Sequence, residues 1–179
     1  MDTNGSHMTP HPASALTWER ADSAEDVHAL LRASDAHTAE RSGLPVPERR
    51  LDSSRRLVAE RAVHLLRHAA EPVAMFTLTP HPPFNRSLDV FPPAGAPLYL
   101  RRLAVHPDWS RRDPTLGLRC VRRACETARA AGADALRAEA NPDLRDSVAL
   151  LIGLGFVQHG PVETEGWMRR VYLQRPLDR

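Results

Sequence analysis

The sequence predicts an α/β fold in which helices flank a mixed sheet. After Leu98, segments with strand and helix periodicity alternate twice, and the chain then ends in two further strand segments. Before that point, an apolar segment that reads as helix or strand and a β-rich segment stand at the spacing of a hairpin. A length of 179 residues suits one domain with a real core and is too short for two comfortable ones. We therefore expect a single α/β domain whose sheet ends in antiparallel strands.

The composition is ordinary for a globular protein, with 42% hydrophobic and 26% charged residues. No apolar run approaches the roughly 18 residues that a membrane span needs. The N-terminus shows no apolar core of a signal peptide. We therefore expect a soluble, cytoplasmic protein that does not associate with membranes.

All 24 basic residues are Arg, because the sequence contains no Lys. This excludes Schiff-base chemistry, and together with the abundant Ala and Pro it indicates a GC-rich coding genome. The net charge of +2 gives no argument for nucleic-acid binding. Clustered Arg side chains, in contrast, suit phosphate groups because of their fork geometry.

The cysteines and histidines do not suggest a disulfide or a metal site. Cys120 and Cys125 are the only cysteines, and at this spacing on a helix they point in different directions, so we expect two buried free thiols. The nine histidines are scattered without metal-ligand spacing, so we expect no metal.

Residues 1–14 are polar, contain proline and lack periodicity, so we expect a disordered tail or tag. The domain should cover residues 15–179. It should start with a short strand at 16–20.

Two helices should follow this strand. Ser23 begins an S-x-x-D capping box that opens a helix, which should end before Gly43. A second, short helix should begin at Ser53 or Ser54.

Residues 62–68 read as continued helix or as strand. The β-rich residues 73–79 follow at hairpin distance, which favours a hairpin. Residues 80–97 contain six prolines and form either a lid or binding loop or a disordered insertion. Phe84 and Phe91 within this loop either contact substrate or anchor the loop to the core.

The second half of the chain should continue the sheet. The expected elements are a strand at 98–105, a loop carrying Arg111 and Arg112, a helix at about 116–131 that Gly132 ends, a strand at 135–140, a helix at about 144–154, and strands near 157–159 and 167–173. The inner face of the first of these helices should carry Leu118, Val121, Cys125 and Ala128.

The junction between strand 98–105 and the helix near Gly117 carries the clearest chemical signal. A helix N-terminus exposes unpaired N–H groups and a partial positive charge, which together bind anions. Flanking Arg side chains strengthen such a site for phosphate. Arg111 and Arg112 therefore either contribute to a phosphate cradle or are solvated loop residues.

Several motifs resemble the GNAT superfamily of N-acetyltransferases: LYLRRLAVHPDW, R-x-x-T-x-G from Arg112 to Gly117, RAAGADALRAEAN and GLGF. The resemblance covers residues 16–177. It implies the order of elements given above, with a splayed central pair of strands at 98–105 and 135–140. It also implies acyl transfer from acetyl-CoA or another acyl-CoA as co-substrate.

The resemblance assigns donor-binding residues. Backbone groups that bind the pantetheine and the acyl carbonyl would belong to Leu103, Ala104 and Val105. The pyrophosphate loop and its flanks would comprise Arg111, Arg112, Asp113, Pro114, Thr115, Leu116, Gly117 and Leu118. Asn141 and Ser147 lie near where the family contacts its cofactor.

The sequence departs from the family pattern at three places. Thr115 stands where the pattern has Gly, and the neighbouring Pro114 lacks an N–H donor, so the phosphate site should be weaker or reshaped. Leu151 stands where the family often has a Tyr that protonates the departing thiolate. Arg101 and Arg102 stand where many relatives have a Glu or His base.

The remaining candidate base is Glu139, near the end of strand 135–140. A carboxylate facing a cleft there would deprotonate an amine directly or through water. The alternative is a surface Glu that pairs with Arg137 or Arg102.

Three functions therefore remain open. The first is an N-acyltransferase that acts on an amine of a small molecule or a protein. The second is a GNAT-fold transferase with another donor, such as aminoacyl-tRNA, because the Arg pairs at 101–102, 111–112 and 122–123 suit a phosphate-rich molecule. The third is a catalytically silent fold used for binding. In each case we expect a monomer or a homodimer.

Overall fold

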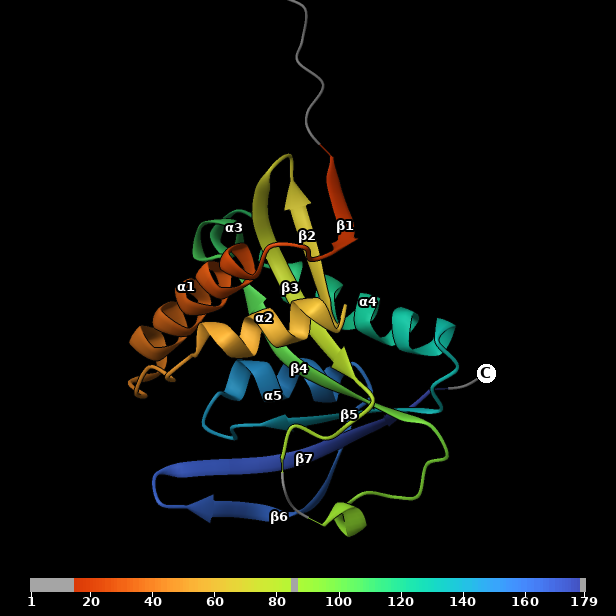
Figure 1. Cartoon of the computed structure of the whole chain (residues 1–179). Helices are drawn as coiled ribbons and strands as arrows, with labels where there is room; N and C mark the ends of the chain where they lie inside the picture. Colours follow the sequence, from red (N-terminus) through yellow and green to blue (C-terminus); the bar gives the residue numbers. More distant parts are fainter. Residues whose placement is uncertain (1–14, 85–86, 178–179) are drawn as a thin grey trace, which may run out of the picture.

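The computed structural model describes residues 15–84 and 87–177 (Figure 1). The strands are β1 (Leu16–Arg20), β2 (Val63–His68), β3 (Glu71–Thr79), β4 (Pro97–Val105), β5 (Ala135–Ala140), β6 (Val157–Glu165) and β7 (Met168–Pro176). The helices are α1 (Ala24–Ser42), α2 (Leu51–Ala59), α3 (Pro107–Arg112), α4 (Leu116–Ala130) and α5 (Arg145–Gly153), with a 3-10 turn at Leu88–Val90. The predicted tail at residues 1–14 lies outside the described residues.

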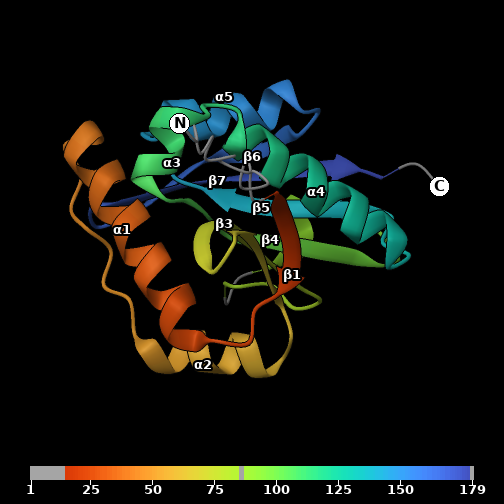
Figure 2. The same cartoon turned by 90° about the horizontal axis from the view of Figure 1, so that it is seen from above.

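The seven strands form one mixed sheet in the order β1-β2-β3-β4-β5-β7-β6. β4 and β5 pair in parallel, and the other neighbouring strands pair antiparallel. Helices α1 and α2 cover one face of the sheet, and α4 and α5 cover the other (Figure 2). Each face has its own apolar cluster, one around Leu31 and Leu57 and one around Leu116 and Phe156. The predicted α/β fold with an antiparallel end is therefore confirmed.

The N-terminal half follows the sequence prediction closely. The Oγ of Ser23 accepts the backbone N–H of Asp26 at 3.1 Å, so the predicted cap starts α1. The ambiguous residues 62–68 form β2 of the predicted hairpin. The start of α2 was predicted too late, because neither Ser53 nor Ser54 caps this helix and both hydroxyls instead accept hydrogen bonds from Arg102.

The C-terminal half corrects three expectations. Residues 107–112 form the short helix α3 where a loop was predicted, because the His106 ring accepts the N–H of Asp108 and Pro107 begins the helix. The last two strands are longer than predicted and are joined at Gly166, which has a φ of +61°. Leu118 is only partly buried, whereas the other residues predicted for the inner face of α4 are buried.

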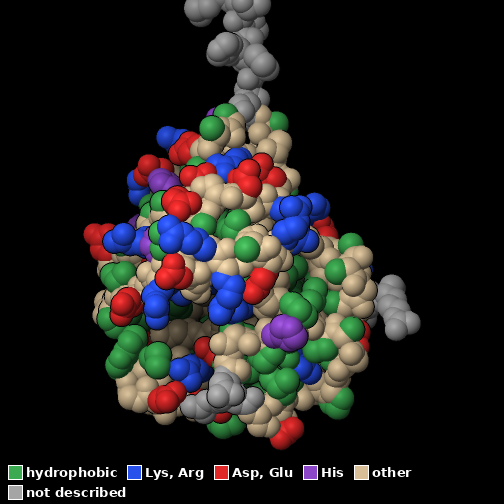
Figure 3. Space-filling view, in the orientation of Figure 1, with side chains coloured by type: hydrophobic (Ala, Val, Ile, Leu, Met, Phe, Trp, Pro, Cys, Tyr) green, Lys and Arg blue, Asp and Glu red, His purple; other side chains and the backbone are tan. Residues whose placement is uncertain are grey.

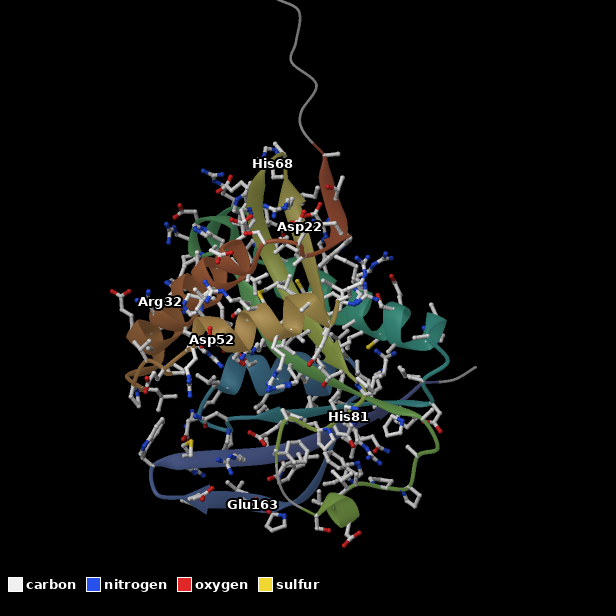
Figure 4. The ribbon with its side chains drawn as sticks, viewed as in Figure 1. Asp22, Arg32, Asp52, His68, His81 and Glu163 are labelled. Carbon is white, nitrogen blue, oxygen red and sulfur yellow. The ribbon has the colours of Figure 1, made fainter. Side chains whose placement is uncertain are left out.

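The proline-rich loop at 80–97 is anchored to the sheet in its described part. The rings of Phe84 and Phe91 lie 5.3 and 5.8 Å from the Tyr172 ring of β7. The Arg137 guanidinium donates to the Pro92 carbonyl at 2.9 Å. Figure 4 shows His81, at the start of this loop, over the lower part of the sheet. Of the two roles considered for the phenylalanines, anchoring is therefore the one observed.

Both cysteines are free and buried, as predicted. Burial raises the pKa of the Cys125 thiol, and it raises that of Cys120 to about 12. Within the part of the chain that the structure describes, no helix combines the length and the apolar character that crossing a membrane requires.

The burial of His64 should make the free energy of unfolding depend on pH. It is 8% exposed on β2, and its ring stacks on Phe76 at 4.6 Å. Burial, followed by the charges of Arg20 and Arg123, lowers the pKa of His64 from 6.5 to about 4. Between these two values the unfolded chain binds a proton that the folded chain does not bind. The free energy of unfolding should therefore fall as the pH falls from about 6.5 to about 4.

Replacing His64 by Leu should remove about 2–3 kcal/mol of this pH-dependent loss. Urea unfolding at pH 7 and at pH 4.5 would measure the loss for each variant. The matched control is His81→Leu, an exposed position whose substitution should leave the loss unchanged. An equal loss in wild type and His64→Leu would show that other groups cause it.

Candidate functional site

β4 and β5 pair over only part of their length. Their parallel ladder ends at Leu100 and Ala138, and no further pair joins the described residues of the two strands. In β4 a bulge follows at once, since two residues oppose Phe76 of β3 and one of them, Arg102, has a φ of +50°. The central strands are thus splayed, as the resemblance implied.

The splayed part of β4 presents backbone groups without a strand partner on the β5 side. The His106 N–H donates to the Val73 carbonyl of β3 at 2.8 Å. Because successive residues of a strand face opposite edges, Ala104 also faces β3, whereas Leu103 and Val105 face the splayed side. Of the three β4 residues assigned to donor binding, Ala104 therefore has its backbone groups turned toward β3 and away from the splayed side.

Ser34 of α1 reaches the same edge of β4. Its Oγ accepts the Val105 N–H at 3.4 Å, which is a long hydrogen bond. Sequence reasoning missed this residue because it lies 71 positions from its partner and no local motif marks it.

The N-terminus of α4 already carries an anion, the carboxylate of Asp113. Its Oδ1 accepts the backbone N–H of Thr115 at 2.9 Å and the Thr115 hydroxyl at 2.6 Å. The Arg119 guanidinium lies 3.3 Å from Oδ2. The two hydrogen bonds from Thr115, the stronger effect from its side chain, lower the pKa of Asp113. The chain thus fills part of the predicted phosphate cradle itself.

Other donors of this helix end remain available. The N–H groups of Gly117 and Leu118 have no hydrogen-bond partner among the described residues. The Leu116 N–H donates to the Asp113 carbonyl at 3.3 Å, and its side chain is fully buried. Pro114 is exposed and contributes no N–H.

Arg111 and Arg112 lie on the last turn of α3. Arg111 forms an ion pair with Asp108 in the same helix. The Arg112 guanidinium lies over the Trp109 ring, 5.1 Å from its centroid. Figure 4 shows His68, whose ring packs against Trp109 at 4.9 Å, at the far end of β2. Both guanidinium groups are therefore held within their own helix rather than on the α4 N-terminus.

Glu139 lies in a cavity of about 320 Å³ on the α1 side of the sheet. The cavity is open to solvent and is lined by α1, the α1–α2 connection, the end of β5 with the turn after it, and the β6–β7 hairpin; we call it the Glu139 cavity. Its apolar wall includes Leu44, Pro45 and Trp167, and Trp167 is 66% exposed. Figure 3 shows a hollow below α1 and α2 that charged side chains border.

The Glu139 carboxylate pairs with a residue that the sequence did not suggest. Its Oε1 lies 3.5 Å from Nε of Arg170 on β7. Nη1 of Arg170 also lies 3.0 Å from Oε2 of Glu165. The alternative, a pairing with Arg137 or Arg102, is not observed, because Arg137 binds Gln174 and Tyr99 and Arg102 binds Ser53 and Ser54. Cross-strand pairing between β5 and β7 places Arg170 here, and only the topology shows it.

Asn141 and Ser147 lie at different cavities. Asn141 lines the Glu139 cavity, and its Oδ1 accepts the Asp143 N–H at 2.9 Å in the turn after β5. Ser147 is exposed on α5 and lines a second cavity of about 230 Å³.

Two further charged residues of the Glu139 cavity were missed from the sequence. Arg49 forms two hydrogen bonds with Asp35, at 2.6 and 3.1 Å, and both side chains are largely buried.

Leu151, where the family often has Tyr, is 6% exposed within the apolar cluster under α4 and α5. Among the described residues, no group of His, Cys, Asp or Glu has an arrangement that fits a metal ion.

The mixed sheet with splayed central strands defines the class of fold. No protein-family model matches the sequence, and no curated protein matches it either. Solved structures do match, and the chain has the fold of the GNAT acetyltransferases.

Three of these structures show how far the similarity extends. A GNAT-family acetyltransferase from Streptococcus agalactiae superposes with a TM-score of 0.73 at 12% identity, over 92% of this chain and 96% of its own. A ribosomal-protein-alanine N-acetyltransferase from Brucella melitensis gives 0.64 at 18% identity, over 90% and 99%. The NatC complex bound to Gag peptide and CoA gives 0.65 at 14% identity, over 91% and 99%. At these identities the similarity shows the fold.

Proposed function

We propose that this protein is an N-acyltransferase that transfers an acyl group, acetyl in the simplest case, from acyl-CoA to an amine. The observation that carries the proposal is the splayed pair β4 and β5, of which the end of β5 borders a cavity containing Glu139. The fold supports it, because the similar structures include N-acetyltransferases and one complex with CoA. A thioester supplies the activated acyl group, and the protein's contribution is positioning and charge stabilisation.

The donor side fits an acyl-CoA in two respects. The backbone groups of Leu103 and Val105 face the splayed side, where a pantetheine chain and an acyl carbonyl would accept or donate hydrogen bonds. The long contact between Ser34 and Val105 is easily exchanged for a shorter one to a carbonyl oxygen. The N–H groups of Gly117 and Leu118 would bind a phosphate oxygen.

The acceptor side fits an amine, of a small molecule or of a protein. The amine nitrogen attacks the acyl carbon, the C–N bond forms while the C–S bond breaks, and Glu139 takes up the proton that the nitrogen loses. The sulfur leaves as a thiolate, because Leu151 offers no proton where the family often has Tyr. Acyl-CoA and two free thiols both suit the cytoplasm, where we place the protein.

A phosphate-rich donor such as aminoacyl-tRNA is less well supported. Arg102 contacts α2 on one face of the sheet, whereas Arg122 and Arg123 are exposed on α4, which covers the other face (Figure 2). The Arg pairs therefore do not form one continuous basic surface.

Calorimetry with acetyl-CoA, CoA and bulk tRNA, each at two salt concentrations, separates the candidate donors. We expect saturable binding of acetyl-CoA and CoA. Binding of tRNA alone, with a steep dependence on salt, would support the other donor instead.

Asp113 should weaken CoA binding, since its carboxylate lies where a phosphate would bind. We expect Asp113→Ala to tighten CoA binding by about 5–10-fold, because removing a like charge stabilises the bound phosphate by on the order of 1 kcal/mol. The same change should lower the unfolding free energy by about 1 kcal/mol through loss of a helix-end hydrogen bond. Calorimetry and urea unfolding measure the two effects.

The matched control is Asp108→Ala, which removes an exposed carboxylate of α3 that pairs with Arg111. It should leave CoA affinity within about 2-fold of wild type, since no helix-end N–H of α4 contacts it. Weaker CoA binding in Asp113→Ala would show that Asp113 organises the phosphate site rather than competing for it.

A further inference from the structure

Two adjacent arginines of β4 face the same side of the sheet. Leu100 belongs to the apolar cluster under α4, so the side chain of Arg101 points to the opposite face, toward α1 and α2. The bulge at Arg102 interrupts the alternation, and Arg102 also points to that face, where it reaches Ser53 at 2.6 Å and Ser54 at 3.4 Å.

Neither guanidinium group has a carboxylate partner among the residues that the structure describes. Arg102 donates only to the two serine hydroxyls, and Arg101 makes no hydrogen bond or ion pair with any described residue. Both side chains are partly buried. Burial, and then the positive charge of Arg56, lowers the pKa of Arg101. The pKa of Arg102 falls to about 10 through burial and the nearby Arg49. Glu60 and Glu139 act on Arg101 in the opposite direction, and Asp35 does so on Arg102, but none of them hydrogen-bonds either guanidinium group. A bound anion that does so would therefore stabilise this part of the protein.

Arg101 lies beside Glu139 at the point where the two strands separate. Leu100 and Ala138 form the last pair of the parallel ladder, so Arg101 and Glu139 are the next residues along each strand and face the same side. Glu60, Glu139 and Arg49 are close enough to act on the Arg101 charge. Glu139 and Arg49 line the Glu139 cavity, and Arg101 lies next to it without being one of its lining residues. The Glu139 carboxylate pairs with Arg170 and not with Arg101. Arg101 and Glu139 therefore do not neutralise each other in an ion pair.

We infer that the acceptor is a zwitterionic, amino-acid-like amine whose carboxylate binds Arg101 while its amino group faces Glu139. This inference rests on the proposed function and names the substrate class of that same site. A guanidinium and a carboxylate on adjacent strands match the two opposite charges of such a molecule. Arg102, held by α2, keeps a second positive charge next to the bound carboxylate.

The neighbouring carboxylate favours a singly charged anion over a phosphate. A phosphate dianion bound at Arg101 would lie near the negative Glu139, which repels it more strongly than it repels a carboxylate. The apolar wall of Leu44, Pro45 and Trp167 favours an acceptor with an apolar side chain. Leucine and its neutral derivatives are therefore suitable probes.

The first experiment compares leucine, leucinamide and 3-methylbutylamine as acceptors at saturating acetyl-CoA. Wild type should use leucine with a kcat/KM at least about 10-fold above leucinamide, and Arg101→Gln should lose at least about 10-fold for leucine alone, as expected for one charged hydrogen bond. Comparing variants cancels the differences in amine basicity. The control Arg55→Gln removes an exposed Arg of α2 that pairs with Glu25 and Asp52, and it should change neither value.

The second experiment needs no turnover. N-acetylleucine and N-acetylleucinamide are titrated into wild type and Arg101→Gln in the presence of CoA, and circular dichroism checks that the variant is folded. We expect tighter binding of the carboxylate compound in wild type and no preference in Arg101→Gln. Equal binding of the two compounds by wild type, or a preference that survives in Arg101→Gln, would overturn the inference.

The two experiments separate this inference from the proposed function. Binding of N-acetylleucine that depends on Arg101, with no transfer to any amine, would keep the carboxylate subsite and refute acyl transfer. Transfer to leucinamide or 3-methylbutylamine as efficient as to leucine would keep acyl transfer and refute the zwitterionic acceptor.

Discussion

Replacing Glu139 by Gln should lower kcat for acyl transfer by about 100-fold or more, since general-base catalysis contributes about 10²–10⁴-fold. Gln has nearly the shape of Glu and can still accept a hydrogen bond from Arg170, so the cavity should keep its form. It cannot take up the proton that the amine loses. The affinity for CoA should stay within about 2-fold of wild type, because the proposed function assigns Glu139 to the acceptor and not to CoA. Steady-state kinetics and calorimetry measure the two quantities.

The matched control for this variant is Glu165→Gln. Glu165 is the other carboxylate that pairs with Arg170, at 3.0 Å, but it is 61% exposed in its side chain and does not line the Glu139 cavity. Its substitution tests whether disturbing Arg170 is sufficient to lower the rate. Equal losses in the two variants would assign the effect to Arg170, and a Glu139→Gln enzyme with normal kcat would remove Glu139 from the reaction.

Replacing Arg137 by Met should lower the free energy of unfolding by about 3–5 kcal/mol, because three buried or partly buried acceptors would lose the charged donor that binds them. Arg137 is 5% exposed and donates to Gln174 at 2.7 Å, to Tyr99 at 3.0 Å and to the Pro92 carbonyl at 2.9 Å. Its guanidinium also lies 4.7 Å from the centroid of the Phe91 ring. Met fills a similar volume but leaves these acceptors without a donor.

Arg137→Met should also release the proline-rich loop from the sheet. Hydrogen exchange should accelerate around Phe91 more than in β2, which lies on the far side of β3 and β4. The control Arg122→Met changes an exposed position of α4 and should lower the unfolding free energy by less than about 0.5 kcal/mol. A loss as small as the control's in Arg137→Met would show that the network contributes little to stability.

Most of the fold could be predicted from the sequence, because local signals mark its elements. The capping box at Ser23, the hairpin spacing before Thr79 and the period of α4 each reflect interactions within a few residues. α3 was missed because its cap is a His106 ring nitrogen rather than a Ser, Thr, Asp or Asn side chain. The start of α2 was missed because the side chains of Ser53 and Ser54 bind a distant strand.

The candidate site was less predictable because tertiary contacts define it. The resemblance pointed to Leu103, Ala104 and Val105, and only the register with β3 shows that Ala104 faces the other way. The strand-loop-helix signal pointed to Arg111 and Arg112, whereas side chains of the same helix engage both. Glu139 could be recognised in the sequence as a carboxylate near the end of a strand. Arg170 and Ser34 come from distant segments, and no local pattern connects Arg170 to Glu139 or Ser34 to Val105.

Backbone amide NMR spectra recorded during a titration with CoA test the central claim most directly, namely that the splayed strands and the N-terminus of α4 form an acyl-CoA site. The account predicts saturable shifts concentrated at Leu103, Val105, Gly117 and Leu118, with the Val105 signal moving as its hydrogen bond to Ser34 is exchanged. Signals of β1 and β2 should stay in place. Saturation without shifts at these four residues, or no binding at millimolar CoA, would contradict the account.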